Sequence, residues 1–218
     1  GAQVVVADLR AEGAEAVAAA VGGLSVTVDV AQGDSVDALA RAVLDRFGRV
    51  DILVNNAGVT HLPAFMEDVS ETDFDRVLAV NAKSVYLTAR AFVPGMKARR
   101  AGAILNIAST AGVSPRPRLN WYNASKGWMI TATRAMAVEL APFGVRVNAL
   151  NPVAGETPLL KSFMGEDTPE SRAKFLSTIP IGRFSTPADI ANAALYLCSD
   201  EASMVTGVAM EVDGGRCI

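Results

Sequence analysis

The sequence predicts an α/β fold in which a doubly wound parallel sheet carries helices on both faces. Short apolar runs rich in β-branched residues alternate with longer segments of helical character along the whole chain. The 218 residues suffice for one domain with a full core, and no change of composition divides them. Half of the residues are hydrophobic and 20% are charged, as in ordinary globular proteins. We therefore expect a single domain over residues 1–218.

The first part of the chain predicts three strands and two helices. The apolar runs that read as buried parallel strands are residues 3–8, 24–28 and 50–54. An alanine-rich helix over residues 11–21 is closed by Gly22-Gly23, and a second helix runs from about residue 34 to 47. Asp34 or Ser35 is the expected N-cap of this second helix.

The second part continues the alternation. Ser70-Glu71-Thr72-Asp73 resembles a capping box and opens a long helix toward Met96. Strands are expected over 103–108, 145–150 and 208–212, separated by the helix that carries Tyr122 and by one that opens at Thr186-Pro187. Glycines and prolines interrupt residues 153–180, and so long an irregular stretch inside a domain is typical of a substrate-binding loop or lid.

Composition excludes several classes of protein. A formal charge of −3 offers no attraction to nucleic acid or to an anionic membrane. Cys198, Cys217 and the single histidine His61 lack metal-ligand spacing, so we expect neither a metal site nor a disulfide framework. No apolar run reaches the ~18 residues of a membrane span, and no secretory signal is visible. The expectation is a cytoplasmic enzyme without a metal.

The chemistry-bearing stretch is residues 109–126. Tyr122 and Lys126 are four residues apart in a helical run, so the phenol and the ammonium share one helix face. A phenol titrates near pH ~10 in water and is a poor base at neutral pH. A neighbouring ammonium favours the phenolate, as general acid–base chemistry requires. Ser109 follows an apolar run and can offer its hydroxyl to a substrate carbonyl.

Ser109, Tyr122 and Lys126 together resemble the catalytic set of the short-chain dehydrogenase/reductase family. Asn55-Asn56-Ala57-Gly58 resembles its NNAG motif, Asn81 its helix asparagine, and Asn151-Pro152 through Thr157 its segment after the sixth strand. The resemblance covers nearly the whole chain. It implies hydride transfer between an NAD(P) nicotinamide and a ketone or secondary alcohol.

The resemblance also assigns roles to the catalytic residues. Tyr122 would be the general acid or base, and Lys126 would lower its pKa and bind the nicotinamide ribose. Asn81 would hold a water that links Lys126 to solvent. Ser125, between the tyrosine and the lysine, is expected to face away from them.

Further positions are implied to contact the cofactor. Asp8 would accept both adenosine ribose hydroxyls and repel the 2′-phosphate of NADP, so NAD(H) is favoured; the nearby Arg10 leaves NADP(H) open. Asp29 and Val30 match the pair at the adenine. The small residues that let the backbone approach the cofactor are Asn56, Ala57 and Gly58, with Asn55 beside them.

The segment after the sixth strand departs from the family pattern at one residue. Gly155 and Thr157 fall where contacts to the nicotinamide carboxamide or a phosphate are implied. Val153 stands where the family usually has glycine, which predicts a shifted loop.

A larger departure lies at the N-terminal end. Family members begin with a strand, a glycine-rich turn that cradles the pyrophosphate, and a helix. Gly13, Gly22, Gly23 and Gly33 do not have that spacing. About one strand–helix unit, roughly 30 residues, is therefore expected to be missing. Either the sequence is part of a longer chain or the protein is a catalytically impaired paralogue that acts as a structural subunit.

The sequence gives the least information about the substrate and the oligomeric state. His61, Asn120 and Trp121, together with Ser109, are expected to line the substrate pocket. Arg116 and Arg118 flank the catalytic loop, where they are either solvated loop charges or partners of a substrate carboxylate or a phosphopantetheine arm. The resemblance favours a 3-oxoacyl thioester substrate, as in acyl-carrier-protein reductases, with sugar or small-alcohol oxidation as the alternative. It also implies a homotetramer or homodimer formed through the helices that contain Asp73 and Asn120 and through the final strand.

Overall fold

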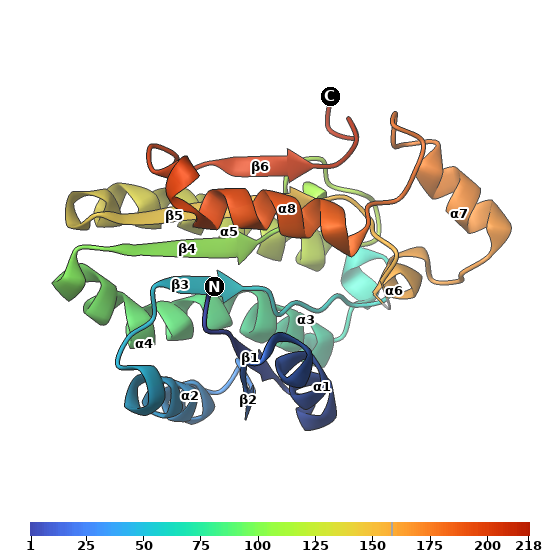
Figure 1. Ribbon diagram of the computed structural model, residues 1–218. Helices are drawn as coiled ribbons and strands as arrows, with labels where there is room; N and C mark the ends of the chain where they lie inside the picture. Colours follow the sequence, from blue (N-terminus) through green and yellow to red (C-terminus); the bar gives the residue numbers. More distant parts are fainter. Residues whose placement is uncertain (158) are drawn as a thin grey trace.

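A computed structural model describes residues 1–157 and 159–218 and shows parallel strands with helices on both sides (Figure 1). Every strand pair is parallel, which confirms the predicted α/β doubly wound class. The strands are β1 (Val5–Asp8), β2 (Leu24–Thr27), β3 (Ile52–Asn55), β4 (Gly102–Ile107), β5 (Val145–Pro152) and β6 (Ala209–Val212).

The helices follow the expected alternation with the strands. They are α1 (Ala11–Val21), α2 (Gly33–Phe47), α3 (Glu71–Leu78), α4 (Ser84–Arg99), α5 (Asn120–Leu140), α6 (Leu160–Met164), α7 (Pro169–Leu176) and α8 (Pro187–Cys198). In Figure 1, α8 lies in front of the sheet while α4 and α5 lie behind it.

Side-chain alternation along β4 explains the two layers. Ile104 packs into the cluster formed with α4 and α5, which includes Met96 and Leu140. Leu105, the next residue, points to the opposite face and packs with Leu197 of α8. Because a strand presents successive side chains to opposite faces, an uninterrupted apolar run serves both layers.

The strands form two separate sheets among the described residues. The first contains β1 and β2, and the second has the order β3-β4-β5-β6. On β3, Ile52 and Val54 are 44% and 47% exposed, although both are apolar residues of a strand. In the family order the expected first strand would lie between β1 and β3, where this division occurs.

Two helix boundaries differ from the predictions. Helix α2 begins at Gly33 with Gln32 as N-cap, because the Ser35 hydroxyl accepts a hydrogen bond from the Asp29 backbone N–H. The long helix expected from Ser70 is interrupted by a π-helical turn, Ala79–Lys83, between α3 and α4. The predicted caps at Ser70 and Thr186 are present, and Thr186 forms a full capping box with Asp189.

Residues 153–180 contain the short helices α6 and α7, which lie beyond the carboxyl ends of the strands (Figure 1). Their apolar side chains form a small cluster of their own, in which Val153 packs with Leu160, Ile179 and Phe184. The valine at the family's glycine position thus anchors this segment to the end of β5. Pro158 falls outside the described residues.

Candidate active site

The carboxyl end of β4 and the first turns of α5 bring the predicted catalytic residues together. Ser109 follows β4 directly, and Tyr122 and Lys126 lie one turn apart on α5. The loop after Ser109 approaches α5 so closely that a Cβ at Gly112 would lie 2.8 Å from the backbone nitrogen of Gly127. Only glycine permits this contact, which holds Ser109 near the tyrosine.

Tyr122 is buried, with 4% of its surface exposed. Burial raises the pKa of its phenol, while a hydrogen bond with Ser109 and the positive charge of Arg116 oppose that rise. That Lys126 lowers the pKa of Tyr122 stays a prediction, since Lys126 is not among the groups that act on the phenol here and desolvation dominates the shift. The phenol is protonated at neutral pH and is suited to donate a proton.

Lys126 is also buried, and its Nζ donates a hydrogen bond to the Ile107 carbonyl at 2.8 Å. Burial lowers the pKa of its ammonium to about 8, so the group is mostly charged at neutral pH. Nζ lies 6.0 Å from the Tyr122 ring centroid. An ammonium has three donors, and only one is used by the described residues. The others remain for a bound group.

Asn81 lies in the π-helical turn and is fully buried. Its Nδ2 donates to the Val59 carbonyl at 2.8 Å and to Ser125 Oγ at 3.0 Å, and its Oδ1 accepts from the Val59 N–H at 2.9 Å. Asn81 thus joins the turn after β3 to α5. The expectation that Ser125 faces away is wrong: its hydroxyl is buried against Asn81 and donates to the Tyr122 carbonyl.

A buried polar chain beneath this site was not predicted. Thr88 Oγ1 donates to Asn55 Oδ1, Asn55 Nδ2 to Asn106 Oδ1, and Asn106 Nδ2 to Thr133 Oγ1, each at 2.8 Å. The chain connects α4, β3, β4 and α5 across one face of the sheet. Asn106, a polar residue inside an apolar strand, was the sequence signal for it.

The turn after β3 fits a nucleotide. Asn56 and Ala57 are exposed, and Gly58 approaches the catalytic groups. A Cβ at Gly58 would lie 3.3 Å from Lys126 Nζ and 3.6 Å from Asn81 Oδ1. The bare backbone here, beside a lysine with unused donors, fits the nicotinamide ribose of a dinucleotide.

The adenine-side residues lie at the ends of β1 and β2. The Asp8 carboxylate is exposed and accepts a hydrogen bond from the Arg10 backbone N–H at 2.9 Å. Asp29 accepts from the Ala31 N–H, and Val30 packs partly against the cluster under α2. The carboxylate of Asp8 keeps free acceptor positions toward solvent.

Gly155 and Thr157 lie at the base of the α6–α7 segment. Gly155 forms a β-bridge with Ser185, and a Cβ at Gly155 would lie 2.8 Å from Ser185 Oγ. Thr157 is exposed, and its backbone N–H donates to the Gly155 carbonyl.

The predicted substrate residues are placed on different sides of the site. His61 is buried, with Nδ1 at 2.8 Å from the Leu62 carbonyl and Nε2 without a partner among the described residues. Trp121 donates to the Met66 carbonyl and packs edge-on against Phe74. Asn120 lines a groove with residues of the Ser109 loop, on the side of α5 away from the reactive phenol.

Two further properties concern the described part of the chain only. None of its helices combines the length and the apolar character that a membrane crossing requires. Within residues 1–157 and 159–218, no three histidine, cysteine, aspartate or glutamate side chains gather as a metal site would require.

The fold and the set of Ser109 with the buried Tyr122 and Lys126 define a nicotinamide-dependent α/β oxidoreductase. The family model described as "Enoyl-(Acyl carrier protein) reductase" matches residues 1–216. Together with the relatives described next, this match shows that the chain belongs to the short-chain dehydrogenase/reductase family.

Several relatives match along the whole chain. The 4-formylbenzenesulfonate dehydrogenase TsaC1/TsaC2 of Comamonas testosteroni is 48% identical, and the 3-oxoacyl-[acyl-carrier-protein] reductase FabG of Thermotoga maritima is 38% identical; both alignments cover 100% of this chain and 89% of the relative. A crystal structure of 3-ketoacyl-(acyl-carrier-protein) reductase from Brucella melitensis complexed with NADH has 50% identity and a TM-score of 0.94, with the same coverage. These relatives support a dehydrogenase or reductase that uses NAD(P).

Proposed function

We propose that the protein interconverts a carbonyl compound and the corresponding alcohol, with Tyr122 as the proton donor and acceptor. The observation that carries the proposal is the convergence of Ser109, Tyr122, Lys126 and Asn81 at the carboxyl ends of parallel strands, where ligands of such sheets bind.

Each side chain has a separate task in the proposed reaction. The nicotinamide, when bound, supplies or accepts the hydride. Ser109 hydrogen-bonds the substrate oxygen, and Tyr122 donates a proton to that oxygen as negative charge develops on it. Lys126 binds the nicotinamide ribose and places a positive charge beside the phenol. Asn81 connects the turn around Gly58 to helix α5 by hydrogen bonds, which keeps Tyr122 and Lys126 in place relative to that turn.

We infer that NAD(H) is the preferred cofactor. Asp8 ends β1 with an exposed carboxylate, which can accept the ribose hydroxyls and would repel a 2′-phosphate. The proximity of Arg10, whose Nε lies 3.9 Å from Asp8 Oδ1, weakens that repulsion without removing it. The NADH in the Brucella melitensis structure supports the same preference.

We further propose that residues 1–218 act as one domain in which residues 153–180 cover the substrate. The names of the relatives support two substrate classes, a 3-oxoacyl thioester and an aromatic aldehyde with an anionic group. Sugar or small-alcohol oxidation remains the alternative from the family resemblance.

The rates in the two directions are expected to depend differently on pH. Reduction needs protonated Tyr122 and oxidation needs the phenolate, and burial raises the pKa of this phenol. Between about pH 6 and 9, oxidation should therefore accelerate with rising pH as the phenolate fraction grows, while reduction stays nearly constant because the phenol remains protonated. Above about pH 8, where Lys126 loses its charge, the rise in the oxidation rate should become less steep, because the ammonium no longer favours the phenolate. Initial rates of NADH formation and of NADH consumption measure the oxidation and the reduction. Replacing NADH by NADPH in the same assay tests which cofactor the enzyme prefers. An oxidation rate independent of pH would contradict Tyr122 as the base.

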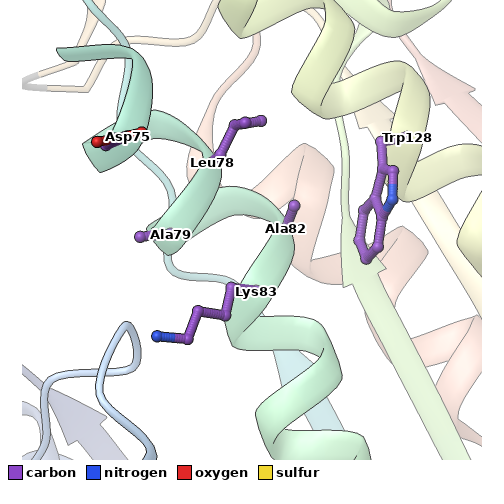
Figure 2. A pocket seen from close by; sticks show the side chains of 6 residues that line it. All are labelled: Asp75, Leu78, Ala79, Ala82, Lys83 and Trp128. Carbon is purple, nitrogen blue, oxygen red and sulfur yellow. The ribbon is translucent and has the colours of Figure 1, made fainter. Parts of the chain in front are cut away.

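We also propose that the chain pairs with a second copy through α3 and α5. A groove here is lined by Asp75, Leu78, Ala79, Ala82, Lys83 and Trp128. Figure 2 shows Leu78 and Ala82 directed toward Trp128, while Lys83 points away. Trp128 is 44% exposed, although its indole is a large apolar surface. Apolar surface on two adjacent helices suits an interface between identical copies.

Replacing Trp128 by glutamate should weaken this assembly at least about tenfold, because a charge would be buried against the partner's apolar surface. Light scattering after size-exclusion chromatography reports the mass against concentration. Val138→Glu is the matched control, since Val138 lies on another face of α5 and is 79% exposed. Equal masses for wild type and Trp128→Glu would exclude this surface as the interface.

A further inference from the structure

The loop between Ser109 and Tyr122 carries an arginine in unusual surroundings. The Arg116 guanidinium lies 4.1 Å from the ring centroid of Phe175 and 6.0 Å from that of Phe163. The Phe163 ring is in turn 5.2 Å from the ring of Tyr122. The Arg116 guanidinium and the Tyr122 phenol therefore both lie near the Phe163 ring, and Arg116 also lies over Phe175 of α7.

Arg116 and Arg216 differ from the other two partly buried arginines, Arg146 and Arg172, in their hydrogen bonding. Arg146 donates to the backbone carbonyls of Leu197, Val205 and Ser199, and Arg172 binds the carboxylates of Asp167 and Glu156. Within the described residues, by contrast, the guanidiniums of Arg116 and Arg216 have no hydrogen-bond acceptor and no carboxylate within ion-pair distance.

These two arginines also lie near each other. The C-terminal segment that carries Arg216 packs under residues 179–181, where the Ile181 N–H donates to the Gly214 carbonyl at 3.0 Å. Burial and the nearby charge of Arg216 lower the pKa of Arg116 to about 10. The Arg116 guanidinium stays cationic at neutral pH. The remaining charged or titratable group that acts on Arg116 is Tyr122 itself.

Because the Arg116 guanidinium has no acceptor among the described residues, its N–H donors are available to a ligand. Its planar set of N–H donors matches a carboxylate or sulfonate, which it binds through two parallel hydrogen bonds. Phe163 and Phe175 offer apolar surface next to it. A ligand with a compact anionic group on a flat apolar ring would bind both the guanidinium and the apolar surface, whereas a neutral sugar would bind neither.

We propose that Arg116, assisted by the charge of Arg216, binds an anionic group of the substrate, and that the substrate is an aromatic carbonyl compound or alcohol that carries a carboxylate or sulfonate. The assignment rests on the proposed reaction at Tyr122, because it specifies the substrate of that same site. The anion fixes the far end of the substrate while Ser109 and Tyr122 meet its carbonyl.

The kinetic test compares 4-formylbenzoate with its uncharged methyl ester. Arg116→Gln should raise KM for the carboxylate by about 10- to 100-fold, the range lost with a charge-assisted hydrogen bond. The KM of the ester should stay unchanged, and Arg116→Lys should recover part of the carboxylate affinity. Arg118→Gln is the matched control, since Arg118 is on the same loop but is exposed and lies over Phe65. Arg118→Gln should leave the KM values of both the carboxylate and the ester unchanged.

A binding measurement separates this proposal from the proposed reaction. Terephthalate has two carboxylates and no reducible carbonyl, so its calorimetric affinity does not depend on turnover. Terephthalate binding that weakens at least about tenfold in Arg116→Gln supports the anion site even if no carbonyl is reduced. Binding that is absent in the wild type or unaffected by the substitution overturns it. An equal loss for carboxylate and ester would also overturn it, since Arg116 would then only hold α7 against the loop.

Discussion

Replacing Tyr122 by phenylalanine is expected to lower kcat by about 10³-fold, within the usual contribution of general acid–base catalysis. Phenylalanine keeps the buried ring and its contact with Phe163, whose centroid lies 5.2 Å away, and removes only the hydroxyl. The Ser109 hydroxyl is far too weak an acid to replace the phenol, and in the proposed reaction the two remaining Lys126 donors bind the nicotinamide ribose, not the substrate oxygen.

The measurement is steady-state turnover together with NADH titration by fluorescence. NADH affinity and the thermal unfolding midpoint should remain close to those of the wild type, since the ring still fills its place. If NADH binding disappears together with turnover, Tyr122 supports the site structurally and the assigned proton transfer is wrong.

Replacing Asn81 by alanine is expected to reduce the free energy of unfolding by about 2–4 kcal/mol. The substitution removes the side chain of the fully buried Asn81 and leaves the N–H and the carbonyl of the partly buried Val59 without their partners. The same change frees the turn that carries Gly58 next to Lys126, so kcat should fall as well.

Chemical denaturation measures the stability loss, and hydrogen exchange at the Val59 amide locates it. Asn120→Ala is a control with identical chemistry, because Asn120 is only partly buried and makes no side-chain hydrogen bond to the described residues. Its effect should stay within about 0.5 kcal/mol. Similar losses for the two variants, or an unchanged Val59 exchange rate, would show that the Asn81 hydrogen bonds do not hold this turn.

Local patterns in the sequence were enough to predict the parallel α/β order and the caps at Ser70 and Thr186. Strand periodicity, helix length and capping chemistry act over a few residues, so they can be interpreted without the fold. The four-residue spacing of Tyr122 and Lys126 is of the same kind, because a helix converts that spacing directly into proximity.

Other features depend on residues that are distant in the sequence. The chain from Thr88 through Asn55 and Asn106 to Thr133 joins four elements, and no local pattern specifies its partners. The π-helical turn at Asn81 is tied to the Val59 turn by hydrogen bonds across 22 residues. In the sequence, Asn81 stands out only through the family resemblance.

The sequence by itself determined which groups stand near the reaction, and the tertiary structure decided how they behave. Spacing correctly paired Tyr122 with Lys126, yet the direction of the Tyr122 pKa shift depends on burial by surrounding elements. For Arg116 the sequence left open a solvated loop charge or a partner for a substrate anion, and only the packing of Phe163 and Phe175 showed that it is partly buried without an acceptor among the described residues. Desolvation is a property of the assembled environment, so only the folded chain reveals it.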